Sequence, residues 1–103
     1  MSSTDTHQTK TFVEQAQNGD QKAFGELVKI HHSQIYGQIL RMVRNSEDAK
    51  EIAQLTWIKV WKKIDSFRFE SAFSSWLYRV ATFTALDAIR KRDSRRELSY
   101  ENP

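Results

Sequence analysis

The fold of this chain is decided by residues 48–92, which read DAKEIAQLTWIKVWKKIDSFRFESAFSSWLYRVATFTALDAIRKR. Apolar residues recur there at helical spacing, and the whole stretch contains neither glycine nor proline. A polar and aromatic segment at 65–70 interrupts this spacing once. We therefore predict a helix over about 47–64, a loop at 67–70 and a second helix over about 72–92.

Two further helices are predicted upstream of this stretch. Apolar residues keep helical spacing over about 21–44, and a short amphipathic helix over about 10–18 precedes them. Asn18-Gly19-Asp20 separates the two helices, because glycine suits a helix end and aspartate caps a helix start. Ser46 and Ser71 are expected to cap the two later helices. The predicted fold is all-α, a compact bundle of three main helices plus a short N-terminal helix.

Composition bounds the class of protein. The 103 residues are 39% hydrophobic and 28% charged, which is typical of one small globular domain. One proline and three glycines are too few turn residues for an all-β fold. The absence of cysteine excludes disulfides and agrees with a cytoplasmic protein. Because no apolar run is long enough and residues 1–11 are polar, we expect neither membrane insertion nor a signal peptide.

The sequence has no group of residues with catalytic or cofactor-binding spacing. It contains no phosphate-binding glycine-rich motif and no zinc-binding H-E-x-x-H. His31 and His32 are neighbours in a predicted helix, so their side chains point about 100° apart and do not readily share a metal. We therefore expect a protein that is not an enzyme and has no catalytic residue, metal or cofactor.

The third predicted helix has apolar residues on two faces. At 100° per residue, one stripe falls between about 160° and 240° from Glu51 and is the expected core face. It consists of Ala49, Ala53, Trp57, Val60 and Ile64. Leu55 and Ile58 fall on the opposite face, between Glu51, Gln54 and Lys62. Isolated exposed apolar residues are common, whereas two adjacent ones framed by polar groups favour an interface, and both interpretations stay open.

The last predicted helix carries a row of rings and guanidinium groups beside its core stripe. The row consists of Trp76, Arg79, Phe83 and Arg90, and the preceding loop adds the rings of Phe67 and Phe69. Unpaired bases stack on aromatic rings, and arginine neutralises the phosphates between them. Aromatic residues at helical spacing also often widen a core. The row therefore predicts either a surface for single-stranded nucleic acid or a broader core.

Basic residues are concentrated at the end of the same helix. The net charge of the chain is +3, and residues 79–96 hold six lysines and arginines against two acidic residues. Such local density attracts polyanions. Lysine and arginine also suit the C-terminal end of a helix because of its dipole. The charge alone therefore does not decide between a polyanion-binding surface and an ordinary solvated helix end.

Residues 48–92 strongly resemble region 2 of bacterial sigma factors, specifically the extracytoplasmic-function group, and the resemblance covers about residues 12–95. Its most specific parts are Asp65-Ser66-Phe67-Arg68, Ser71-Ala72-Phe73 and Trp76-Leu77-Tyr78-Arg79-Val80-Ala81, with Asp87 and Arg90 behind them. The resemblance implies a transcription initiation module. The alternatives are a helical protein-interaction module without nucleic-acid binding and a small enzyme, for which the sequence offers no positive sign.

The resemblance implies that the third predicted helix binds the clamp helices of the β′ subunit of core RNA polymerase. The residues carried over for this contact are Asp48, Glu51, Gln54, Leu55, Ile58 and Lys62. The family often has an acidic residue where this chain has Leu55. An apolar contact at that position is the expected consequence.

The resemblance also implies that the loop and last helix recognise the promoter minus-ten element and hold its melted non-template strand. The residues carried over are Phe67, Arg68, Phe69, Ser71, Ala72, Phe73, Trp76, Arg79, Phe83, Arg90, Lys91 and Arg92. This chain departs from the family pattern at two of them. It has Phe69 where the family usually has glycine, and Phe83 where the family often has asparagine.

The domain boundaries follow from the same reading. Residues 1–9 are polar and expected to be disordered, residues 10–93 form the region 2 domain, and residues 94–103 are expected to start a linker. In the family this linker leads to a second helical domain, which reads the minus-thirty-five element and which this chain lacks. We interpret the chain as an excised domain rather than a natural single-domain variant. An anti-sigma factor is a further expected partner.

Overall fold

The computed structural model describes the backbone of residues 7–101 and the side chains of residues 7–95. The described chain is helical and contains no strand, which confirms the predicted all-α class. Its elements are α1 (His7–Gln17), α2 (Gln21–Val43), α3 (Ser46–Lys63), the 3₁₀ turn η1 (Ile64–Ser66) and α4 (Phe73–Glu101).

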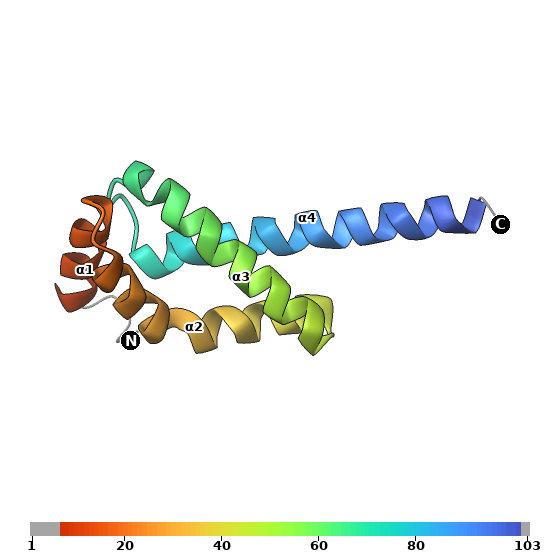
Figure 1. Cartoon of the computed structure of the whole chain (residues 1–103), viewed down its shortest axis with the longest axis horizontal. Coiled ribbons are helices and arrows are strands. Elements are labelled where there is room, and N and C mark those ends of the chain that lie inside the picture. The colour runs from red at the N-terminus through yellow and green to blue at the C-terminus, as the bar shows by residue number, and fades with distance from the viewer. Residues whose placement is uncertain (1–6, 102–103) are drawn as a thin grey trace.

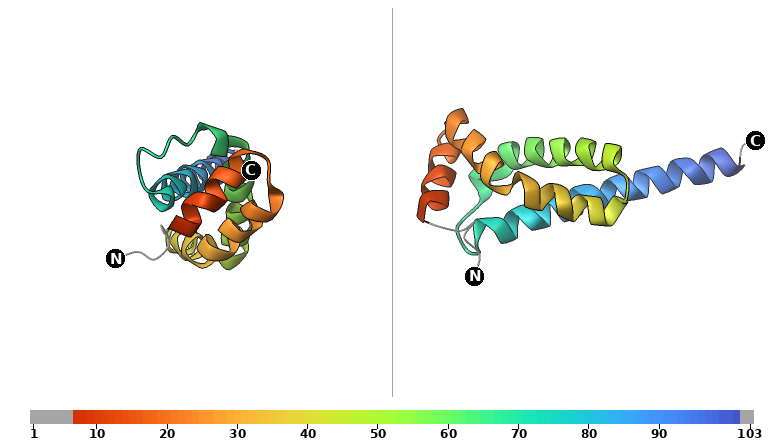
Figure 2. Two further views of the ribbon diagram at one scale, coloured as in Figure 1. Left: turned by 90° about the vertical axis from the view of Figure 1, so that its left-hand side faces the viewer. Right: turned by 90° about the horizontal axis from the view of Figure 1, so that it is seen from below.

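The three long helices pack against one another, and α1 lies across one end of the bundle (Figure 1). This is the end at which α3 stops and α4 begins, so α1 is next to the connection between them. The C-terminal part of α4 extends past α2 and α3 (Figure 2). The molecule is therefore elongated, with extents of 55 × 26 × 24 Å.

The core is built from the apolar stripes that face the centre of the bundle. Its largest fully buried apolar side chains are Leu27, Ile35, Ile39, Ile64, Leu77, Val13 and Val60. Spacings of three and four residues within each helix place these side chains on a single face. Burial of each large side chain contributes about 1.5–3 kcal/mol. His31 of α2 is also buried, and its ring packs edge-on against that of Phe73, with the ring centroids 5.4 Å apart.

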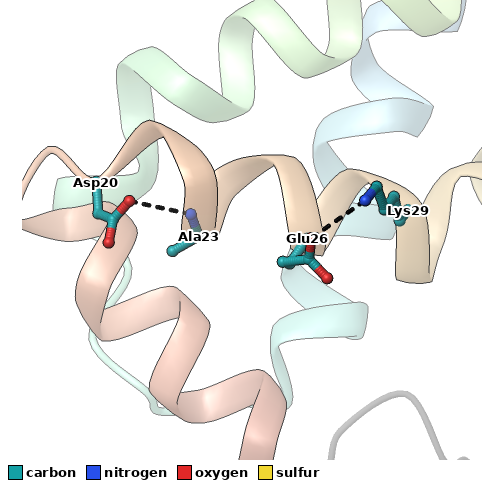
Figure 3. Close-up of polar contacts among 4 residues, drawn as sticks. All are labelled: Asp20, Ala23, Glu26 and Lys29. Carbon is teal, nitrogen blue, oxygen red and sulfur yellow. Dashed lines mark hydrogen bonds and ion pairs between the residues drawn. The ribbon is translucent and has the colours of Figure 1, made fainter.

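The predicted N-cap residue is confirmed at the start of α2 and is wrong at the starts of α3 and α4. Asp20 acts as an N-cap: its side chain accepts hydrogen bonds from the Lys22 amide at 2.9 Å and from the Ala23 amide at 3.1 Å. Figure 3 shows the second of these bonds. At α3 the prediction of Ser46 is wrong, because Asn45 accepts from the Asp48 amide at 2.9 Å. Ser71 does not cap α4 either.

The start of α4 is closed by a backbone carbonyl. The carbonyl of Ala72 accepts from the amides of Ser75 at 3.1 Å and Trp76 at 3.2 Å. The hydroxyl of Ser71 instead donates to the Ala72 carbonyl at 3.3 Å. The first helical residue is therefore Phe73, one position later than predicted.

The described helices extend further than the predicted ones at both ends of the domain. Helix α1 begins at His7, three residues before the predicted start, and Thr9 is buried. Helix α4 continues to Glu101 instead of stopping at 92. Residues 93–101 contain no glycine or proline that would end it. Residues 1–6 and 102–103 lie outside the described residues.

One polar contact ties α2 to α4 midway along the bundle. The side-chain amide of Gln38 donates to the hydroxyl of Thr82 at 2.6 Å and to the carbonyl of Tyr78 at 3.2 Å. These bonds fix the register of α4 against α2. Within the described residues, no helix is long and apolar enough to cross a membrane.

Replacement of the N-cap carboxylate tests the start of α2. Asp20→Ala should lower the free energy of unfolding by about 1 kcal/mol, because two backbone amides lose their acceptor. Urea unfolding followed by circular dichroism measures this. Glu26→Ala is the matched control, since it removes only a 3.3 Å surface ion pair with Lys29 (Figure 3). Glu26→Ala should change the free energy of unfolding by less than about 0.5 kcal/mol. Equal losses in the two variants would contradict the assignment of Asp20 as the N-cap.

Candidate functional site

Helix α3 presents its two faces as the angles predict. Ala49, Ala53 and Val60 are buried against the core. On the opposite face, Leu55 is 49% and Ile58 51% exposed to solvent. Glu51, Gln54 and Lys62 are exposed around them. Leu55 and Ile58 are therefore dispensable for packing, and they form an apolar patch with a polar rim, which is typical of a docking surface.

A groove of about 780 Å³ runs between α2 and α3 beside this patch. Its lining residues are Val28, His32, Tyr36, Lys50, Ala53, Gln54, Trp57 and Ile58. The sequence did not reveal it, because it is formed by side chains from two helices that are far apart in the chain. The indole N–H of Trp57, one of the lining residues, is buried and has no hydrogen-bond acceptor among the described residues.

An ion pair joins residues that the sequence places in two different sites. The Asp48 carboxylate of α3 lies 3.6 Å from the Arg92 guanidinium of α4. Both side chains are more than a third exposed, so the pair contributes little to stability and can exchange for another partner. Lys91 likewise pairs with Asp87 at 3.2 Å. Arg90 is exposed and forms no ion pair with the described side chains.

The aromatic residues of the predicted strand-binding set divide into buried and exposed members. Phe67 is 5% and Phe73 4% exposed, with their ring centroids 5.7 Å apart. The expectation that the loop presents the Phe67 ring to a base is therefore wrong. Phe67 anchors the loop in the core, because burial of its ring outweighs exposure to water. Phe73 is buried for the same reason.

Three rings of the set keep solvent-exposed surface. Trp76 is half-buried, with its centroid 5.4 Å from that of Phe67. Phe69 lies on the other side of Phe67 at 4.8 Å and is 40% exposed. Phe83 is 66% exposed on the outer face of α4. The predicted row thus exists as a surface, with Phe67 as its buried support.

Polar and basic groups of the set surround these rings. Arg79 is exposed, and its guanidinium donates to the Ser71 hydroxyl at 3.5 Å. Arg68 and Ala72 are also exposed in the loop. Arg79 follows Trp76 by three residues and precedes Phe83 by four, so a cation and two rings share one face of α4. Such a surface suits a single-stranded polyanion with planar bases.

The loop is attached to α1 through a residue that the sequence did not single out. The side-chain amide of Gln17 donates to the carbonyls of Ile64 and Phe67, both at 2.9 Å. The two carbonyls flank the 3₁₀ turn η1, and the Ile64 carbonyl also accepts from the Phe67 amide at 3.1 Å. Gln17 thus fixes the first residue of the loop.

The part of the chain that the structure describes contains no metal-binding arrangement. No three histidine, aspartate or glutamate side chains gather there as metal ligands. The neighbouring His31 and His32 are separated by burial, the first lying in the core and the second on the surface.

Comparison with known proteins identifies the family. The family described as Sigma-70 region 2 matches residues 27–95, which is more than half of the chain. The chain therefore belongs to the sigma-70 region 2 family, and the family predicted from residues 48–92 is confirmed. It resembles extracytoplasmic-function members in particular. It is 42% identical over 83 residues to the ECF RNA polymerase sigma factor SigW of Bacillus subtilis, covering 81% of this chain and 44% of that protein.

A second sigma factor is similar to the chain over nearly the same length. The chain is 39% identical over 88 residues to the RNA polymerase sigma-H factor of Pseudomonas aeruginosa, covering 85% of this chain and 46% of that protein. The chain thus spans less than half the length of these relatives.

Solved structures share the fold. An engineered region 2 of sigmaE in complex with GTAAAA aligns with a TM-score of 0.79 at 37% identity, covering 92% of this chain and 97% of that one. CnrH in complex with the cytosolic domain of CnrY aligns with a TM-score of 0.72 at 26% identity, covering 85% of this chain and 61% of that one. The predicted helical bundle is thereby confirmed.

The division between buried and exposed rings is testable by stability. Phe67→Ala should lower the free energy of unfolding by about 3–5 kcal/mol, because it removes a buried ring from the core. Phe83→Ala, its matched control on the exposed surface, should change it by about 0.5 kcal/mol or less. Urea unfolding of both variants measures the difference. A large loss for Phe83→Ala would show that its ring packs in the core.

Proposed function

We propose that this chain is the region 2 domain of an extracytoplasmic-function sigma factor that binds the melted non-template strand of a promoter minus-ten element. The observation that carries the proposal is the solvent-exposed row of rings and cations on the loop and α4. The structural neighbour in complex with GTAAAA supports it, because that protein has the same fold at 37% identity.

The energetics fit a strand that is already separating. Each base that stacks on an exposed ring contributes about 1–3 kcal/mol, and arginine contacts neutralise the phosphates. Unpairing of a base costs a few kcal/mol. Two or three rings with neighbouring cations therefore offset the cost of holding a short unpaired segment. The domain stabilises an opened strand and needs no catalytic group for it.

We further propose that α3 docks on the β′ clamp helices of core RNA polymerase. Leu55 and Ile58 supply the apolar centre, and Glu51, Gln54 and Lys62 supply the polar rim. Asp48 lies at the edge of the same helix in its pair with Arg92. The docking face and the strand-binding row lie on different helices, so both can be occupied at once.

An anti-sigma factor is the third partner that we propose. The solved CnrH structure contains the cytosolic domain of CnrY, and CnrH shares this fold. The groove between α2 and α3 is apolar and contains Ile58 in its wall. A partner seated there would cover part of the polymerase-docking face. Occupation of the groove would thus compete with polymerase.

Strand binding predicts separable effects of rings and charges. Phe83→Ala should weaken binding of a single-stranded GTAAAA oligonucleotide by about 1–3 kcal/mol without changing its salt dependence. Arg79→Gln should reduce the slope of log affinity against log salt by about 0.7, because one phosphate contact is lost. Fluorescence anisotropy over a salt series measures both. Wild-type protein without any salt-dependent binding would favour the protein-interaction module instead.

Polymerase docking predicts loss of binding without unfolding. Leu55→Glu and Ile58→Asp should each weaken binding to core RNA polymerase at least tenfold, because a charge replaces an apolar contact. Co-migration with core polymerase on a native gel measures this. Their helical circular dichroism should match the wild type, and its loss would overturn the face assignment. Phe83→Ala serves as the control and should bind polymerase normally.

A further inference from the structure

Helix α1 reaches the strand-binding loop through a residue that neither the motifs nor the row includes. The ammonium group of Lys10 lies 5.9 Å from the ring centroid of Phe69, over its face. A cation at this distance is attracted by the electron-rich face of the ring. Lys10 comes from the first helix and Phe69 from the loop, so only the fold brings them together.

The position of Lys10 is set by the same helix face that holds the loop. Lys10 and Gln17 are seven residues apart in α1, which places them on one side of the helix, two turns apart. Gln17 binds the Ile64 and Phe67 carbonyls at 2.9 Å. The two hydrogen bonds therefore hold α1 against the loop and keep Lys10 beside it.

Phe69 has an unusual backbone for its residue type. Its φ is +60°, in the left-handed region where a bulky side chain costs free energy that glycine does not. The ring packs on Phe67 at 4.8 Å with a tilt of 57°, which helps to offset this cost. Even so, 40% of Phe69 remains exposed. An aromatic side chain is thus held in a strained position with a free ring surface.

Apart from its contact with the Phe69 ring, the Lys10 ammonium group forms no ion pair within the described part of the molecule. Glu14 lies one turn further along α1 and Glu70 follows Phe69 in the loop, and both are exposed. Neither forms an ion pair with Lys10. Arg68 adds a second exposed cation to the loop. The ammonium group is therefore available to an anion that approaches the ring.

We propose that Lys10 and Phe69 form a nucleotide-binding pair that extends the strand site onto α1. A base of the unpaired strand replaces the Lys10 ammonium group on the exposed face of Phe69, and Lys10 turns to contact an adjacent phosphate. Because every base has a face to stack, the pair adds affinity and salt dependence but no base selectivity. The inference rests on the proposed function.

The charge half of the pair is tested by the salt dependence of GTAAAA binding. Lys10→Gln should reduce the slope of log affinity against log salt by about 0.7, the effect of one lost contact to a single strand. Lys50→Gln is the matched control, because Lys50 is exposed on α3 and roughly 20 Å along that helix from its loop end. It should leave the slope unchanged. An unchanged slope for Lys10→Gln would overturn the proposal.

The ring half is tested by two substitutions of one residue. Phe69→Leu should weaken binding of the same oligonucleotide roughly 5-fold or more at fixed salt, because the stacking face is lost, and should leave the slope unchanged. Glycine adopts the left-handed backbone without strain, so Phe69→Gly is the second variant to measure if Phe69→Leu does not fold. Wild-type affinity in a folded Phe69 variant would overturn the proposal.

These outcomes separate failure of the pair from failure of the proposed function. If the wild-type chain does not bind GTAAAA, the proposed function fails. If it binds and the Lys10 and Phe69 variants bind equally well, only the pair fails. A Lys10 variant with a lower unfolding midpoint but an unchanged slope would assign Lys10 a structural role and overturn the proposal.

Discussion

The candidate site depends on the packing of the buried Phe67 ring against Phe73 and Trp76. This ring fills the space beside Phe73 and Trp76 at the point where the chain passes from α3 to α4. Gln17 holds the same point through the Phe67 carbonyl. Two residues after this anchored point, Phe69 has a left-handed backbone and keeps part of its ring exposed.

This arrangement separates stability from recognition within a few residues. Buried rings and aliphatic side chains hold the bundle, and each contributes through the removal of apolar surface from water. Rings that add little to the core remain on the surface at Phe69 and Phe83. The same separation occurs across α3, whose buried stripe opposes Leu55 and Ile58. One short chain can thus present two surfaces without weakening its core.

Periodicity predicted the helices and their faces because both depend on local geometry. Leu55 and Ile58 are exposed as their angles required. The predicted ends were less accurate, because Ser46 and Asn45 are both suitable caps and the choice between them depends on the backbone. The burial of Phe67 was missed because an aromatic residue in a loop has no periodicity that indicates its direction.

The all-α class, the four helices, the core stripes and the sigma-70 region 2 motifs could all be predicted from the amino-acid sequence, since they follow from residue types and their spacing. The burial of individual loop rings, the position of the groove between α2 and α3, and the contact of Lys10 with Phe69 became visible in the folded molecule. Contacts between residues distant in the chain depend on how the helices pack. That packing is set by the sum of all side-chain contacts, which no local pattern encodes.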